Sequence, residues 1–149
     1  ENQNSTPEIN TNEITKIEFS RGACFGFCPI YTYTIVPNAE STFLAKAFNF
    51  SQKRPTGDEI EGEYKAKLDP QTWTEILSLV NEIEFTTDSM YYRKPMTDMP
   101  SADLTVWYAS GKNKYIHDYG MSGTEQLKNL YHYFDKLKNK KEWGIVITK

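Results

Sequence analysis

The sequence lacks the features by which several classes of protein are recognised. No apolar run approaches the roughly 20 residues that a membrane-spanning helix needs, because charged residues interrupt the most hydrophobic stretches every few positions. Basic residues are not in excess, with 17 Lys and Arg against 20 Asp and Glu, so no strongly basic surface is available to gather phosphates. We therefore expect no transmembrane segment and no nucleic-acid partner.

The motifs of several enzyme classes are absent as well. The sequence has no glycine-rich loop for a nucleotide, no Gly-x-Ser-x-Gly elbow of hydrolases and no His-Glu-x-x-His of zinc proteases. Zinc would need two ligands beyond the two cysteines, and His117 and His132 are too far apart to match finger-like spacing. We expect no metal and no cofactor, and a noncatalytic protein rather than an enzyme.

What is present is the pattern of one soluble α+β domain. A chain of 149 residues is long enough to bury roughly two-thirds of the surface of its unfolded form. Residues 1–13 are polar and rich in Asn, Thr and Ser, which predicts a flexible tether before a single domain over 14–149. The first residue is Glu1 rather than Met, and we expect that a leader was removed from an exported protein, either periplasmic, outer-membrane lipoprotein-like or secreted.

Alternation of apolar and polar residues predicts strands at 14–20, 30–36, 41–48, 60–68, 104–108 and 115–119. Helical spacing predicts one helix from the N-cap Asp69 to about Ile83, and a second over Leu127 to Phe134 with Ser122 or Thr124 as its N-cap. Residues 88–100 show no clear period and are predicted to form a long loop, and residues 143–148 a short β-like tail.

The order of these elements predicts a mainly antiparallel sheet of about six strands with two helices packed on one face. Each helix follows an alternating strand, which suggests two related halves, although few residues match between them.

The most distinctive segment links the first two predicted strands and reads RGACFGFCPIY from Arg21 to Tyr31. It closely resembles the Arg-Gly-x-Cys-Phe-Gly-x-Cys-Pro-x-Tyr opening of a bacterial family known as domain of unknown function 6438. The resemblance continues more loosely through 91–98, 104–108, the pair Asp118-Tyr119 and Trp143. It implies a fold shared with envelope and lipoprotein-like sequences. Because that family carries no established activity, no catalytic residue is transferred.

Several interpretations compete for Cys24 and Cys28. The leading one is a structural disulfide that pins the loop. The loop-closure entropy that it removes from the unfolded chain would stabilise the fold by roughly 2 kcal/mol. A redox site is the sharper alternative, but three residues separate these cysteines instead of the two of thioredoxin-like motifs, and no helix begins at Cys24 to activate its thiol. Zinc ligation and two reduced, buried thiols are the remaining alternatives.

Aromatic residues provide the candidate binding surface. Ten tyrosines, eight phenylalanines and three tryptophans exceed the needs of a core of this size, and amphipathic aromatics are enriched where proteins bind one another. The long loop contains Tyr91, Tyr92, Arg93 and Met96, which we predict to form a binding surface. The alternative is that they cap an open end of the sheet.

The remaining titratable candidates receive structural interpretations. His117 and Asp118 are neighbours on a strand, so their side chains point to opposite faces and cannot pair with each other. We expect His117 and His132 to have ordinary surface or core roles. Asp98 and Asp103 could bind a cation, but turn formation is the commoner role of such residues.

The sequence thus predicts a noncatalytic envelope or secreted binding module with a disulfide-pinned loop, whose partner is a protein, peptide or glycan. The alternative is a thiol-dependent redox or nucleophilic enzyme that uses Cys24 or Cys28, which requires an exposed thiolate, a nearby cation such as Arg21 and a pocket. A purely structural domain is a third hypothesis. The ligand, the oligomeric state and the strand order do not follow from the sequence.

Overall fold

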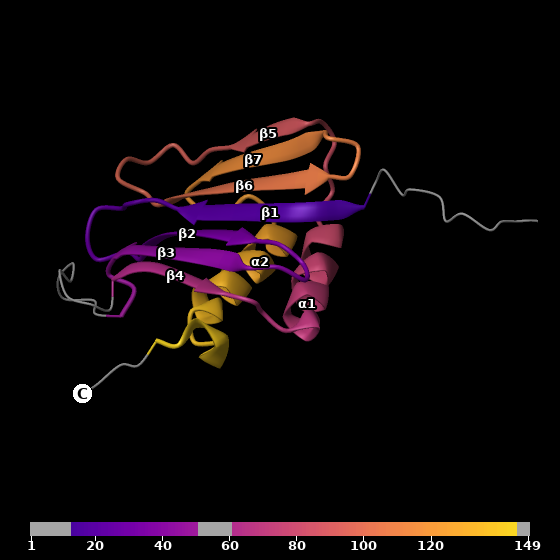
Figure 1. The fold of residues 1–149 in the computed structure, drawn as a ribbon. Helices are drawn as coiled ribbons and strands as arrows, with labels where there is room; N and C mark the ends of the chain where they lie inside the picture. Colours follow the sequence, from indigo (N-terminus) through magenta and orange to yellow (C-terminus); the bar gives the residue numbers. More distant parts are fainter. Residues whose placement is uncertain (1–12, 51–60, 146–149) are drawn as a thin grey trace, which may run out of the picture.

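Seven strands form one mixed sheet in the computed structural model, which describes residues 13–50 and 61–145 (Figure 1). The strands are β1 (Ile14–Arg21), β2 (Ile30–Ile35), β3 (Ser41–Ala47), β4 (Gly62–Ala66), β5 (Ser89–Tyr92), β6 (Ser101–Tyr108) and β7 (Asn113–Tyr119). Their order across the sheet is β4-β3-β2-β1-β6-β7-β5. Neighbouring strands run antiparallel except for β5 and β7, which are parallel. The α+β class and the mainly antiparallel sheet are as predicted.

Both helices begin at the predicted N-caps. Helix α1 (Pro70–Asn81) follows Asp69, whose carboxylate accepts a hydrogen bond from the Thr72 amide at 2.8 Å. Helix α2 (Glu125–Leu137) follows Thr124, whose hydroxyl accepts from the Leu127 amide at 3.1 Å. Each cap satisfies an amide that the first helical turn would otherwise leave unpaired. The two helices lie on the same side of the sheet (Figure 1).

Two predictions for irregular segments are wrong. Ser89–Tyr92, within the predicted long loop, forms the edge strand β5, because pairing with β7 orders a segment too short to show a period of its own. The predicted β-like tail, 143–148, is not a strand in its described residues 143–145, where Trp143 is the last residue of a 3₁₀ turn over Lys141–Trp143. The Trp143 indole is buried and donates to the Leu137 carbonyl at 3.0 Å, which holds this segment against the end of α2. Residues 146–148 of that prediction lie outside the described residues.

The core lies between the helices and one face of the sheet. Phe134 of α2 stacks on Phe19 of β1 with ring centroids 4.6 Å apart and on Tyr33 of β2 at 5.3 Å. All three side chains are fully buried. Deleting a buried aromatic ring of this kind costs about 3–5 kcal/mol, so this stack is a main source of attachment between α2 and the sheet.

Hydrogen bonds to two carboxylates fasten α2 at two further points. Asp135 accepts hydrogen bonds from the Tyr31 hydroxyl and from Arg21, whose guanidinium lies 3.0 Å away. Asp118, at the end of β7, is 1% exposed and accepts from the Gly123 amide at 2.9 Å and the Tyr131 hydroxyl at 2.6 Å. Because a buried carboxylate is stable only when its acceptors are filled, Asp118 fixes the turn that leads into α2.

Three further predictions concern the N-terminal tether, the two related halves and the absence of a membrane-spanning helix. The predicted tether, 1–13, lies outside the described residues except for Glu13. The hypothesis of two related halves stays a prediction. The strand arrangements of the two groups differ, because β1 to β4 are successive antiparallel neighbours whereas the second group includes the parallel strand β5. In the part of the chain that the structure describes, no helix is long and apolar enough to cross a bilayer.

Candidate functional site

The face of the sheet opposite the helices is open to solvent and presents a row of polar side chains across the strands. Strand pairing places Tyr91 beside His117, His117 beside Asp103, Asp103 beside Ser20, and Ser20 beside Thr32. None of these side chains is fully buried. Side chains in register on one face of neighbouring strands are within reach of each other, so functional groups from five strands meet along this row.

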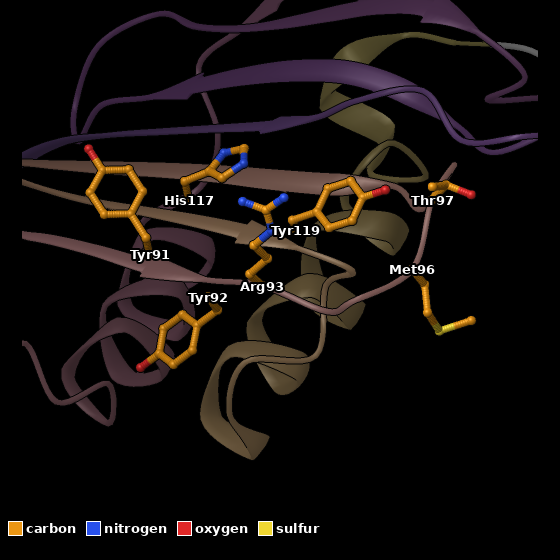
Figure 2. A pocket seen from close by; sticks show the side chains of 7 residues that line it. All are labelled: Tyr91, Tyr92, Arg93, Met96, Thr97, His117 and Tyr119. Carbon is orange, nitrogen blue, oxygen red and sulfur yellow. The ribbon is translucent and has the colours of Figure 1, made fainter.

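A hollow of about 350 Å³ lies at the β5 end of this row. It is lined by Tyr91, Tyr92, Arg93, Met96, Thr97, His117 and Tyr119 (Figure 2). The four residues predicted as a binding surface thus line one hollow, together with two ring-bearing residues of β7. The volume is at the lower end of the range of ligand pockets, about 300–1,000 Å³.

Tyr92 has a different position from the other predicted residues. Alternation along β5 directs Tyr91 and Arg93 to the open face and Tyr92 to the helix side, as Figure 2 shows. Tyr92 is partly buried against the core, and its ring lies directly over Gly123, where a β-carbon would be 2.6 Å from Cγ of the ring. Tyr92 therefore anchors β5 to the turn before α2, while Tyr91 and Arg93 face the hollow.

Asp103 organises two rings on the open face. Nδ1 of His117 lies 2.7 Å from the Asp103 carboxylate, and the Tyr115 hydroxyl donates to the same oxygen. A carboxylate accepts hydrogen bonds, so Nδ1 is the nitrogen that carries the proton and Nε2 is left free. Burial of the phenol, followed by its bond to Asp103, raises the pKa of Tyr115 above its usual range. His117 and Tyr115 are thus held in fixed orientations.

A histidine held this way can act as a base, but the described residues supply no nucleophile for it. The Ser20 hydroxyl, although next to Asp103, is bonded to Thr32 Oγ1 at 2.9 Å. Asp98 and Asp103 do not form a cation site, because Asp103 is engaged by His117 and Tyr115, and no metal-binding group of three His, Cys, Asp or Glu occurs in the described ranges. The geometry supports binding better than acid–base catalysis.

Arg93 places a positive charge at the hollow that a ligand could reach. It is exposed, and within residues 13–50 and 61–145 it forms neither an ion pair nor a hydrogen bond with any carboxylate. Arg21 differs, because its guanidinium is bound to Asp135 and its side chain is only 16% exposed. In Figure 2 the Arg93 guanidinium lies between the rings of His117 and Tyr119.

The two cysteines form a disulfide in the loop between β1 and β2. Cys24 and Cys28 have Cα atoms 5.8 Å apart, and the chain has no further cysteine. The loop exposes Phe25 by 85% and Phe27 by 56%. The Phe25 amide donates to the Asp98 carbonyl at 3.0 Å, so the disulfide loop contacts the segment that follows the hollow residues Met96 and Thr97. Neither cysteine lines the hollow itself.

Sequence analysis missed three residues of the hollow, namely Thr97, His117 and Tyr119. His117 was expected to have an ordinary surface or core role. Its Nδ1 is hydrogen-bonded to Asp103, and its ring nevertheless lines the hollow. The signal for the β7 residues was the alternation of Tyr115, His117 and Tyr119, which places three rings on one face. His132 is exposed on α2 and lies outside this site.

Comparison with protein families places most of the described chain in a known family. A family model described as "Domain of unknown function (DUF6438)" matches residues 15–138, which include all seven strands except the first residue of β1, and both helices. No curated protein and no solved structure matches the chain.

Proposed function

The chain belongs to the family described as domain of unknown function DUF6438, and from the geometry of its open face we propose that it is a noncatalytic binding module of an exported protein. The ligand is a protein, peptide or glycan, and the hollow at β5 and β7 is its binding site. The aromatic loop with the disulfide borders this site. No cofactor takes part in the proposed function.

One observation carries the proposal: the hollow combines aromatic rings, a thioether and a cation on a fixed framework. Tyr91 is 70% and Met96 58% exposed, although burial of such side chains would be favourable. Aromatic residues, Met and Arg are the types enriched in interfaces. The regular strands β5 and β7 hold several of these groups, which lowers the entropy that ordering a flexible site would cost on binding.

Export is supported by the disulfide. Such bonds form and persist in oxidising compartments and are rare in the cytosol. A cell-envelope location, periplasmic or lipoprotein-like, or secretion would keep the bond intact and would present the open face to extracytoplasmic ligands.

The alternative of a thiol-dependent redox or nucleophilic enzyme has less support. Both sulfur atoms are joined in the disulfide, so an attacking thiolate exists only after reduction. Arg21, the cation that such an enzyme would place near the thiol, is bound to Asp135. The hollow is lined by other residues.

The test is a binding screen with panels of soluble oligosaccharides and phage-displayed random peptides. We expect hits whose binding is weakened at least about tenfold by Tyr91→Ser combined with Met96→Ser, because both remove apolar contact area. Leu44→Ser is the matched control, since it removes a partly exposed apolar side chain on β3, near the opposite edge of the sheet. Melting curves establish that each variant is folded. An absence of hits, or hits unaffected by the Tyr91/Met96 pair, would refute the proposal and favour a purely structural domain.

A further inference from the structure

Resting on the proposed function, we infer that the hollow binds the C-terminal carboxylate of an extended peptide that pairs with the outer edge of β5. Two features lie next to each other, a cation and a strand edge, and neither has a partner among the described residues.

The cation is placed at the end of the strand. Arg93 directly follows β5, whose last residue is Tyr92. Its planar guanidinium presents paired donors that match the two oxygens of a carboxylate. Asp103 binds Tyr115 and His117, and within the described ranges Arg93 forms no ion pair with Asp98 or with any other carboxylate. A carboxylate from outside would therefore meet a guanidinium that no carboxylate of the described residues binds.

His117 supplies a second donor when it is protonated. Asp103 holds Nδ1, so Nε2 accepts a hydrogen bond in the neutral ring and donates one in the imidazolium. The titratable and charged groups around the ring are Asp103 from β6, Tyr115 and Tyr119 from β7, Tyr91 from β5 and Arg93, which follows β5. A carboxylate bound next to Nε2 would therefore accept a hydrogen bond from the imidazolium.

The strand edge favours a peptide over a sugar acid. β5 is the last strand of the sheet order, and no described element pairs with its outer side (Figure 1). Unpaired edge groups can take an added strand through main-chain hydrogen bonds. A peptide that runs parallel to β5 ends beside Arg93, with its last side chain near Tyr91. A glycan would use the rings but would leave the edge unpaired.

Two pools of acetylated tetrapeptides test the inference. The pools are identical in sequence and differ only in ending with a free carboxylate or with an amide. Nuclear magnetic resonance of the full chain follows the Arg93 Nε–H, the His117 ring and the β5 amides. We expect the acid pool to shift these signals and the amide pool to bind about 10- to 100-fold more weakly, the usual effect of losing a charge-assisted bidentate pair.

Variants separate the two donors. Arg93→Gln should weaken the acid pool by a similar factor and leave the amide pool unchanged. Lys65→Gln is the matched control, because Lys65 is an exposed cation on β4, the opposite edge strand. His117→Gln, which cannot carry a positive charge, should weaken the acid pool by a smaller factor than Arg93→Gln, while the Arg93 dependence remains.

The inference is wrong if the amide pool binds as well as the acid pool, if neither shifts the Arg93 signal, or if methyl glucuronide shifts it when the peptides do not. These outcomes leave the proposed function standing whenever neutral peptides or glycans still bind in the hollow. If the screen of the previous section finds no ligand at all, both fail together.

Discussion

Breaking the Cys24–Cys28 disulfide should destabilise the domain by about 2 kcal/mol without unfolding it. The bonded residues are only four positions apart, and the loop-closure entropy that so short a ring removes from the unfolded chain is worth about 2 kcal/mol at 25 °C. For a domain of this size each kcal/mol corresponds to roughly 4 °C, so the melting temperature should fall by about 8 °C.

Native contacts of the loop should outlast the bond. The Phe25 amide remains bonded to the Asp98 carbonyl, and the Phe27 ring remains edge-on to Phe48 with centroids 5.2 Å apart. The core stack of α2 on the sheet lies elsewhere and is untouched. We therefore expect the loss to come mainly from the unfolded state, with the same denaturant dependence before and after reduction.

The assay compares urea unfolding of the oxidised protein, the reduced protein and the variant with Cys24→Ala and Cys28→Ala. The double variant is the control for the reductant, whose addition should not change its stability. A loss of stability below about 0.5 kcal/mol would refute the entropy argument. It would mean that the unfolded chain gains almost no conformational entropy when the disulfide is broken. A loss above about 4 kcal/mol would also refute it, since the native loop contacts would then depend on the bond.

Two further predictions concern buried polar groups. Alkaline pH should unfold the domain cooperatively, because burial raises the pKa of Tyr31, Tyr33 and Tyr131 above the ordinary value. The contribution of these tyrosines to the free energy of unfolding is fully present below about pH 10. Above that pH it falls by about 1.4 kcal/mol per pH unit for each tyrosine. Tyrosinate absorbance and circular dichroism should change together, and ionisation of these tyrosines in a chain that keeps its dichroism would contradict their burial. Asp118→Asn should cost about 1–3 kcal/mol in urea unfolding, because an amide nitrogen replaces one of two acceptor oxygens: either the one that accepts from both Gly123 and Tyr131, or the one that accepts from the Ser122 amide. Asp98→Asn is the control, since Asp98 is exposed with a backbone φ of 60° that Asn tolerates, and equal losses in the two variants would argue against the buried role of Asp118.

The helices and six of the strands were predictable because their signals are local. Asp69 and Thr124 cap helices through bonds to residues three positions on, and alternation within a strand needs no knowledge of its partner. Strand β5 was not predictable in this way. Four residues, SMYY, contain too few alternations to indicate a strand, and its parallel partner β7 begins more than 20 residues later in the sequence.

The same distinction applies to the hollow. Tyr91, Arg93 and Met96 were predicted from the composition of one segment, and the structure places all three on the hollow. His117 and Tyr119 join them only through the parallel register, which pairs Tyr91 with His117. That register is set by tertiary packing, including Tyr92 against Gly123, and sequence spacing contains no information about it.

Topology also explains why the disulfide loop and the hollow are neighbours. The chain leaves β5 at the sheet edge and must pass the end of β7 to enter β6, a lateral distance of about 10 Å. The segment 93–100 makes this crossing and is fastened on the way, since the Gly120 amide donates to the Pro100 carbonyl at 2.8 Å and the Met99 amide to the Tyr119 hydroxyl at 3.2 Å. β1 ends beside the start of β6, where the Gly22 amide donates to the Ser101 carbonyl at 2.9 Å. The loop after β1 therefore meets the crossing segment at Asp98, so a ligand bound in the hollow would lie close to a loop whose conformation the disulfide restricts.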